Sequence, residues 1–371
     1  MHISSLALTN YRNHRNSHIS FDAGNNVIVG RNGLGKTNVV EAVYYCATLE
    51  SHRVPTDSPL IENGFSNAII RADVGKHQRR ANLEINIKQT GSNTAALNGV
   101  AVSRTRDILG LVKSVIFSPE DLDLVKGEPS FRRSYLDDFC VQLRPAFAGI
   151  RLDYEKVVRQ RNSLLKSFGR RNPPGPALTT LEAWDEQLID YAVQVMTSRL
   201  EALEVLSPLI KEHGEMMSGG AEPVSVTYGS KWCDELGETG SDLRQQLELA
   251  IANLRSSEID RGMTLVGPHR DDLLVHLNQG PAKGYASHGQ SWSIALALKL
   301  AVFSALRQFD DDPILILDDV FAELDTHRRS RLESALDQIE QTIITVADAD
   351  DVPVGLQGNY IELSNVMNNA G

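Results

Sequence analysis

The sequence predicts an α/β protein in which one nucleotide-binding head is assembled from both ends of the chain, with a mainly helical lobe inserted between them. Three observations lead to this prediction. A complete glycine-rich phosphate loop stands near the N-terminus, at residues 30–37. An apolar strand that ends in two aspartates stands near the C-terminus, at residues 313–319. Helical patterns of apolar residues dominate the stretch between them, at 121–255.

The phosphate loop fits GxxxxGK[ST] at every fixed position. Its residues are Gly30, Arg31, Asn32, Gly33, Leu34, Gly35, Lys36 and Thr37. Residues 26–29 predict a short buried strand before the loop and 38–49 a helix after it, which is the context this loop requires. Backbone N–H groups and the helix dipole are expected to hold the phosphates of ATP. Lys36 is expected to reach the β- and γ-phosphates, and the Thr37 hydroxyl to ligate Mg²⁺. The alternative is a glycine turn that binds nothing.

Two aspartates follow the apolar strand near the C-terminus. An aspartate at this position can hold the Mg²⁺ that bridges nucleotide phosphates, and we assign that role to Asp318. Asp319 then stands where a general base, or a residue that positions the attacking water, would be. An ordinary aspartate has a pKa of about 3.9, which is low for a base at neutral pH, so hydrolysis is expected to be slow. The alternative is a strand that ends in two solvated carboxylates.

A second phosphate-binding surface is predicted at the start of a long apolar helix, 291–309. Its candidate residues are Ser287, Gly289 and Gln290. A hydroxyl, backbone N–H groups and the positive end of a helix dipole can bind phosphate together. ATP-binding-cassette proteins use such an element to contact the γ-phosphate that is bound to the other subunit. A similar stretch at 217–220 has no glutamine and no helix after it, so we expect a loop there. Residues 322–325 stand where such ATPases carry a loop that crosses the dimer interface.

Lys36 and Asp318 are 282 positions apart, a gap that a minimal nucleotide-binding domain does not need. We therefore expect an ATPase lobe made of 1–120 plus 256–371 and an inserted helical lobe at 121–255. No sustained heptad run occurs, so long coiled-coil arms are not expected. The three cysteines have no CxxC spacing, which fits a reducing cytoplasm. No run of eighteen apolar residues and no secretion signal occur, so we expect a cytoplasmic protein without a membrane partner.

Longer segments carry a family resemblance that covers nearly the whole chain. They are LALTNYRN at 6–13, SHR at 51–53, FSPEDL at 117–122, KG at 126–127, Pro129, RR at 132–133, LD at 136–137, QRNSLLK at 160–166 and GPHRDDL at 267–273. In these segments the chain resembles the RecF family of bacterial recombination-mediator ATPases, relatives of the SMC and ABC-type ATPases. GPHRDDL is long enough to be quite specific, whereas ATP-cassette proteins in general share only the three nucleotide motifs.

The resemblance implies an ABC/SMC-type P-loop ATPase head and an ATP-dependent DNA-binding protein. RecF-like proteins bind double-stranded DNA, prefer the borders of single-stranded gaps, and form a homodimer around two ATPs. With RecR, and in some pathways RecO, they help load RecA onto gaps coated with single-strand-binding protein, and they support the SOS response to DNA damage. The expectation for this chain is a clamp with weak ATPase activity that serves recombination, replication and repair. The alternative is the energy subunit of an ATP-binding-cassette transporter, which would need a coupling groove for a membrane partner.

The chain departs from the pattern of such ATPases at three places. Ser291 and Trp292 stand where relatives often carry a basic or polar residue after the signature glutamine. The stretch 346–348 offers no histidine to sense the γ-phosphate, and FSPED at 117–121 has no glutamine. These departures bear on the rate of hydrolysis more than on nucleotide binding. Arg12 is expected either to approach the nucleotide, as in SMC-like heads, or to lie on the surface.

The net charge of −11 does not exclude a nucleic-acid partner, because binding needs a local basic patch rather than a basic total. Residues 151–171 hold seven basic and two acidic side chains. Phosphate contacts from such a patch give salt-dependent affinity with little sequence reading. The candidate contacts are Arg159, Lys166 and Arg170 on one predicted helical face, and Arg79 and Arg80 on a predicted hairpin. The alternative is that these charges form an ordinary solvated surface.

Overall fold

The computed structural model describes residues 1–76, 79–169, 175–220, 222–237, 239–309, 312–336, 339–352 and 355–364. The chain divides into two compact units. The head unit comprises Met1–Lys126, Pro208–Val224 and Leu277–Gly371, and the helical unit comprises Gly127–Ser207 and Ser225–His276. Both chain ends belong to the head, as the sequence predicts.

The boundaries between the units differ from the expected ones. Residues 121–126 and 208–224 belong to the head, and 256–276 belong to the helical unit. The boundary at 207/208 falls inside α5 (Gly175–Ser218), one continuous helix of 44 residues that contributes to both units and contains Pro208. A boundary that falls inside a continuous helix is not marked by a change in amino-acid composition, so the sequence does not reveal it.

A five-stranded parallel sheet forms the centre of the head unit, in the order β14-β3-β13-β12-β8. Its strands are β3 (Gly24–Val29), β8 (Ser114–Phe117), β12 (Ile314–Asp318), β13 (Gln341–Val346) and β14 (Asn359–Glu362). The three predicted strands at 26–29, 313–319 and 342–346 are present as β3, β12 and β13. Because the strands are parallel, their carboxyl ends meet at one edge, where α/β proteins bind ligands.

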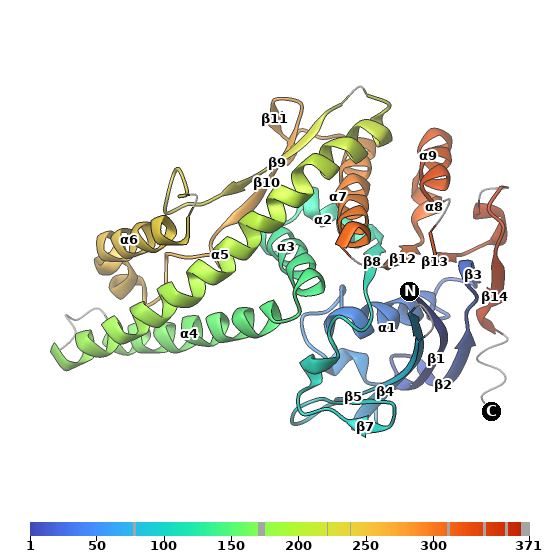
Figure 1. Ribbon diagram of the computed structural model, residues 1–371, viewed down its shortest axis with the longest axis horizontal. Helices are drawn as coiled ribbons and strands as arrows, with labels where there is room; N and C mark the ends of the chain where they lie inside the picture. Colours follow the sequence, from blue (N-terminus) through green and yellow to red (C-terminus); the bar gives the residue numbers. More distant parts are fainter. Residues whose placement is uncertain are drawn as a thin grey trace. The chain divides into compact units, whose positions relative to one another are not determined.

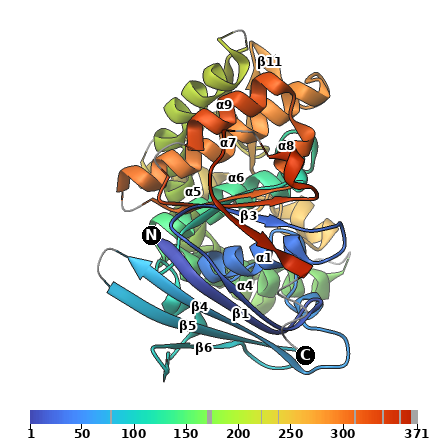
Figure 2. The same cartoon turned by 90° about the vertical axis from the view of Figure 1, so that its right-hand side faces the viewer.

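A second sheet of the head unit is antiparallel, in the order β2-β1-β4-β5-β6-β7. Its strands are β1 (His2–Tyr11), β2 (His14–Ser20), β4 (Asn67–Lys76), β5 (Arg79–Lys88), β6 (Thr94–Leu97) and β7 (Val100–Ala101). The helix α1 (Lys36–Thr48) lies between the two sheets, as Figure 2 shows, and shares one apolar core with both. A helix with apolar neighbours on both sides is buried all round, which explains why Val39, Ala42, Val43 and Cys46 are all inaccessible to solvent.

The remaining helices of the head unit include α7, a long helix that precedes the acidic strand (Figure 1). These helical segments are η1 (Ser58–Leu60), η2 (Thr105–Ile108), η3 (Pro119–Leu122), α2 (Asp123–Lys126), α7 (His288–Phe309), α8 (Val320–Glu323), α9 (Thr326–Leu336) and η4 (Ala349–Asp351). The short strand β11 (Gly280–Pro281) also belongs to this unit. Within the described part of the chain, α7 alone is long and apolar enough to cross a membrane by length and composition. Since 78% of its apolar window is buried inside the protein, it has the character of a core helix.

The helical unit contains four helices and a strand pair (Figure 1). They are α3 (Pro129–Leu143), α4 (Phe147–Phe168), the first part of α5, α6 (Gly240–Arg261), β9 (Val224–Gly229) and β10 (Asp272–Leu277). Arg161 of α4 donates hydrogen bonds to Asp185 of α5 and to Glu258 of α6 over 2.8 and 2.5 Å. Arg199 of α5 makes a bidentate pair with Asp137 of α3. Ion pairs of this kind, buried and hydrogen-bonded, fix which helix faces meet.

Candidate nucleotide-binding site

The phosphate loop occupies the turn between β3 and α1, at the carboxyl edge of the parallel sheet. Gly35 precedes α1 with φ of 97°, a left-handed conformation that favours glycine. A Cβ at this position would lie 2.4 Å from Oδ1 of Asn13 and 2.6 Å from Nε2 of His14. Glycine is therefore required here both by the backbone and by the space.

The turn between β1 and β2 supports the loop from outside. Asn13 donates from Nδ2 to the carbonyl of Leu34 over 3.2 Å, and His14 donates from Nε2 to the carbonyl of Gly35 over 3.1 Å. His14 is buried, and burial lowers the pKa of its imidazole, so the ring is neutral and its Nδ1 accepts from the Ser17 hydroxyl. Two consecutive carbonyls are thereby held outward, which leaves backbone N–H groups free to face the loop interior. Nothing in the sequence motif signalled His14.

Lys36 begins α1 and is folded back over the loop. Its Nζ donates to the carbonyl of Gly30 over 2.9 Å and to Oδ1 of Asn32 over 3.2 Å. Asp319 Oδ1 lies 3.8 Å from the same nitrogen, and the Lys36 side chain is 3% exposed. A buried ammonium with only one carboxylate near it can bind a further anion at low desolvation cost, which fits the predicted phosphate contact.

Asp318, at the end of β12, connects the two distant motifs. Its Oδ1 accepts hydrogen bonds from the hydroxyls of Thr37 over 3.2 Å and of Thr345 over 2.5 Å. The pKa of Asp318 is raised to about 6, chiefly by burial and also by the neighbouring Asp319, against the lowering effect of the hydrogen bonds from Thr345 and Thr37. The sequence predicted the strand that contains Thr345 but not its part in the site.

Asp319 follows directly and has a different environment. It adopts φ of 52°, and its backbone N–H donates to the carbonyl and the hydroxyl of Thr345. Burial raises the pKa of its carboxyl group and the nearby Lys36 ammonium lowers it. Its side chain is 36% exposed, so it has access to water that Asp318 lacks.

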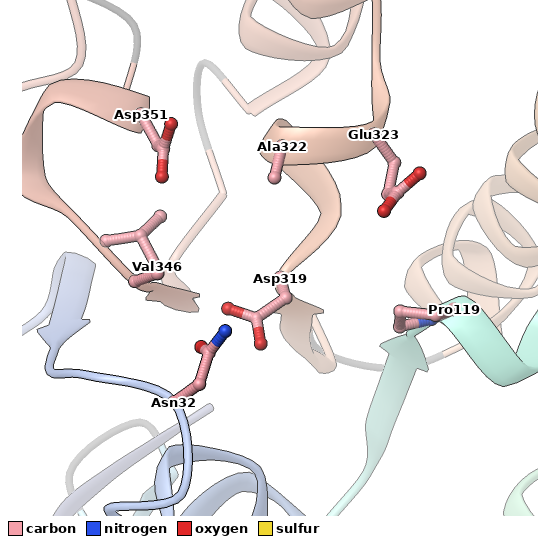
Figure 3. Close-up of a pocket in the computed structure, with 8 residues that line it drawn as sticks. Asn32, Pro119, Asp319, Ala322, Glu323, Val346 and Asp351 are labelled. Carbon is pink, nitrogen blue, oxygen red and sulfur yellow. The ribbon is translucent and has the colours of Figure 1, made fainter.

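A pocket of 260 Å³ opens beside these aspartates (Figure 3). Its lining residues are Asn32, Pro119, Asp319, Ala322, Glu323, Val346, Ala347 and Asp351. They follow the carboxyl ends of β3, β8, β12 and β13, so four strands converge on one cavity. Figure 3 shows the side chains of Asn32 and Asp319 directed toward each other. The pocket is therefore lined both by the phosphate loop and by the residue that follows the acidic strand.

The donor set at Thr37 and Asp318 fits Mg²⁺. The two ligand atoms would be the Thr37 hydroxyl oxygen and an Asp318 carboxylate oxygen. Mg²⁺ in nucleotide sites typically takes one or two protein oxygens together with phosphates and waters. The raised pKa of Asp318 reflects a buried carboxylate for which a bound cation would compensate. Within the described residues no cluster of three or more His, Cys, Asp or Glu side chains forms a metal site, so a cation here would depend on the nucleotide.

The three candidate residues of the second phosphate surface form a separate cluster. The backbone N–H of Ser287 donates to Oε1 of Gln290, and the N–H of Gln290 donates to Oγ of Ser287. This reciprocal arrangement caps α7. The helix begins at His288 rather than at 291, so Gly289 and Gln290 lie in its first turn. Gln290 also donates to Glu222 over 2.5 Å. The similar stretch at 217–220 ends α5 and continues into a glycine turn, so its first two residues are helical rather than part of a loop.

Four of the five candidate DNA contacts are exposed, and the fifth lies outside the described residues. Arg159 and Lys166 are exposed on α4, and Arg79 and Arg80 are exposed at the start of β5, where β5 pairs with β4. Arg170 lies outside the described residues. Arg161, which contributes to the basic count of this stretch, is fully buried by its carboxylate partners and cannot contact DNA.

The Arg12 side chain does not lie free on the surface, because it pairs with Glu41 of α1. Its guanidinium donates from Nε and Nη2 to the two oxygens of the buried Glu41, and the Ser51 hydroxyl donates to the same carboxylate. The backbone of Arg12 has φ of 55°. The side chain is 16% exposed, so Arg12 ties the β1–β2 turn to α1 rather than extending freely into solvent.

Comparisons with known proteins agree with this geometry. The sequence model of the RecF/RecN/SMC N-terminal domain family matches residues 2–355. The curated protein "DNA replication and repair protein RecF" from Renibacterium salmoninarum is 42% identical over 393 residues, with 99% of each chain covered. The protein of the same name from Streptomyces avermitilis is 44% identical over 367 residues, with 98% of each chain covered.

Solved structures give the same result. A structure of the recombination mediator protein RecF with ATPrS superposes with a TM-score of 0.87 at 28% identity, covering 98% of this chain and 96% of that chain. An Smc head domain from Pyrococcus furiosus has a TM-score of 0.51 at 16% identity, covering 94% of this chain and 90% of that chain, and shares the fold alone. The α/β ATPase-head fold and the family resemblance predicted from the motifs are thereby confirmed. Because the family model spans residues 2–355 and the curated relatives match over nearly all of the chain, this protein belongs to the RecF family.

Proposed function

We propose that this protein is a cytoplasmic, ATP-dependent, double-stranded-DNA-binding protein of replication and recombinational repair. In this proposal two copies join around two ATPs and act as a clamp at the borders of single-stranded gaps. The clamp supports RecA loading and the SOS response, with RecR and in some pathways RecO as partners. The names of the curated relatives and the solved RecF structures with ATP and ATPrS support the repair role and the nucleotide.

The observation that carries the proposal is the convergence of the phosphate loop and the acidic strand. Lys36 exchanges its contacts with Gly30 and Asn32 for oxygens of the β- and γ-phosphates. The N–H groups of Gly30 and Leu34 donate to the carbonyls of Val346 and Arg31. Other backbone N–H groups of the loop, together with the start of α1, hold the remaining phosphate charge. These groups are already in place, since Gly35 is fixed by Asn13 and His14 from the β1–β2 turn. A preorganised loop loses little entropy when the nucleotide binds.

Thr37 and Asp318 would hold Mg²⁺ against the phosphates. When bound, the metal would neutralise charge on the phosphate oxygens. Asp318 accepts from Thr37 and Thr345 through the same oxygen, which leaves the other carboxylate oxygen to face the cation. Asp319, half exposed at the pocket, orients the attacking water and accepts its proton. Its pKa is raised by burial but restrained by Lys36, so it is a weak base, and slow hydrolysis follows.

The second copy enters through Ser287, Gly289 and Gln290. These residues bind the γ-phosphate that the first copy's Lys36 holds, so each ATP contributes to joining two heads. Hydrolysis removes the shared contacts, and the difference in binding energy between the two states makes ATP a switch. The exposed Arg159, Lys166, Arg79 and Arg80 supply DNA phosphate contacts whose strength falls with salt.

The proposal is tested by DNA binding measured through fluorescence anisotropy with ATP, with ADP and without nucleotide. The probes are a labelled duplex, the same duplex with a single-stranded gap, and a single strand of equal length. We expect tight binding to duplex and gapped DNA only with ATP, and none by Lys36→Ala. Equal binding in all three nucleotide states would overturn the switch, and preference for the lone single strand would overturn the duplex assignment.

A further inference from the structure

Gly289 lies directly against an arginine of the same chain. A Cβ at Gly289 would lie 3.1 Å from Nη1 and 3.2 Å from Nη2 of Arg328 on α9. Arg328 also donates from Nε to Oγ of Ser293 over 2.8 Å. Because Gly289 and Ser293 are four positions apart on α7, they lie on one face of the helix. The guanidinium therefore lies against the first turn of α7, on the face that carries Gly289 and Ser293.

The same guanidinium holds the loop that follows the acidic strand. Its Nη1 forms an ion pair with the carboxylate of Asp325, and the backbone N–H of Arg328 donates to Oδ1 of Asp325 over 2.9 Å. Asp325 is the last residue of the stretch 322–325, whose Ala322 and Glu323 line the pocket. One side chain thus connects the start of α7 with the segment that leads from Asp319.

The electrostatics of this arrangement are not those of a stabilising contact for α7. The start of a helix carries a partial positive charge, so a cation placed there is unfavourable. Asp325 offsets part of this, but its side chain is 49% exposed. Helix-dipole electrostatics alone therefore do not account for the placement of the Arg328 guanidinium against Gly289 and Ser293.

We propose that Arg328 is a positioning residue that holds residues 287–290 and residues 322–325 as one rigid surface for a second copy's nucleotide. This inference rests on the proposed function and deepens it. A Cβ at position 289 would press on the Arg328 guanidinium at 3.1 Å, so a glycine there leaves the guanidinium in place. Loss of Arg328 frees the two segments from each other, so the surface must be ordered again each time two heads join.

The test uses the full chain and two separate measurements. The affinity of the monomer for a fluorescent ATP analogue reports the phosphate loop, and sedimentation equilibrium with ATP reports dimerisation. The variants are Arg328→Ala, Gly289→Ala and the double variant. The matched control is Arg331→Ala, which removes another arginine of α9 whose Nη1 donates to the Met217 carbonyl at the end of α5. Thermal melts verify that each variant is folded.

Arg328→Ala is expected to weaken ATP-dependent dimerisation by about tenfold or more, while ATP affinity stays within about twofold of wild type. Arg331→Ala is expected to dimerise like wild type. The double variant is expected to dimerise about as weakly as the more impaired of the two single variants, because both substitutions disturb the same contact between position 289 and position 328. Additive effects, equal loss in Arg331→Ala, or normal dimerisation of Arg328→Ala would each overturn the inference. If wild type itself fails to dimerise with ATP, the proposed function fails instead.

Discussion

The Thr37 hydroxyl donates a hydrogen bond to the Asp318 carboxylate over 3.2 Å, although 281 positions separate the two residues in the chain. The contact exists because α1 starts, and β12 ends, at the same edge of the parallel sheet. It joins the phosphate loop to the acidic strand, so the Mg²⁺ ligands come from opposite ends of the chain.

Replacing Thr37 by alanine is expected to weaken nucleotide binding mainly in the presence of Mg²⁺. The variant loses one metal ligand but keeps the glycine turn and Lys36. We expect about a tenfold loss of affinity for ATP with Mg²⁺ and little change with EDTA. Titration calorimetry in both buffers measures the difference, and Thr37→Ser, which retains the hydroxyl, is the control. Equal losses with and without Mg²⁺ would show that Thr37 supports the loop rather than the metal.

The affinity for ATP with Mg²⁺ is expected to fall as the pH drops through about 6, the pKa to which burial raises Asp318. A metal needs the ionised carboxylate, and each pH unit below this value costs about tenfold in that species. ATP itself takes up a proton in this range, so Asp318→Asn serves as the control. The wild-type curve should be steeper than the variant's curve between pH 7.5 and 5. Parallel curves would exclude Asp318 as the titrating ligand.

The same substitution, Asp318→Asn, is expected to stabilise the nucleotide-free protein. The folded pKa of Asp318 is about 6, above its ordinary value of 3.8. The stability that protonated Asp318 contributes is therefore fully present below its pKa in the unfolded protein, 3.8, and is lost as the pH rises through its pKa in the folded protein, about 6. Asparagine keeps the acceptor for Thr37 and Thr345 without the buried charge. At pH 7.5 the free energy of unfolding should rise by on the order of 2–3 kcal/mol. Urea denaturation at pH 7.5 and 4 checks this, since the gain should vanish at the lower pH.

Arg159 and Arg161, two positions apart on α4, are expected to respond oppositely to alanine. Arg161 is fully buried between Asp185 and Glu258. Its removal takes the guanidinium partner from the buried Glu258 and leaves Asp185 paired with Arg255, and should cost about 3–5 kcal/mol of stability. Arg159 is exposed and pairs with Glu155 at 3.6 Å, so its removal should leave stability within about 0.5 kcal/mol.

DNA binding separates the same two variants. Arg159→Ala should weaken duplex binding and reduce the slope of affinity against salt concentration by about one. Urea denaturation and anisotropy titrations at several salt concentrations give both quantities. If Arg159→Ala leaves the salt slope unchanged, this face of α4 does not contact DNA. If Arg161→Ala unfolds at the wild-type urea concentration, the ion network does not hold the helical unit together.

The parts of the fold that local pattern determines were predictable. The strand β12 is a continuous apolar run before its aspartate, and β3 and β13 contain the shorter apolar runs 27–29 and 343–344, as expected of parallel strands buried on both faces. The phosphate loop combines a fixed motif with its required strand and helix, so the position of α1 also followed from the sequence. The placement of Asp318 near Thr37 was an inference from motif identity, since nothing local relates two residues so far apart.

The rest depends on partners that are distant in the chain. Arg161 belongs to a basic run by sequence, but its partners Glu258 and Thr264 stand 97 and 103 positions away. Thr345 and His14 gain their parts in the site from a neighbouring strand and a neighbouring turn. The boundary between the units falls inside α5, where helical periodicity simply continues. A local sequence pattern predicts one helix or strand at a time, so it does not predict contacts between residues that are far apart in the chain.

The measurement that tests the central claim most directly is mass in solution by light scattering, with ADP and with ATP, with and without duplex DNA. Lys36→Arg and Ser287→Arg are measured alongside, because one alters the phosphate loop and the other the surface predicted to contact the second copy's nucleotide. The account predicts that ATP alone converts monomer to dimer, that both substitutions abolish the conversion, and that duplex DNA joins only the dimer. A mass that ignores ATP while DNA still binds would contradict the account, and the phosphate loop would then serve something other than dimerisation.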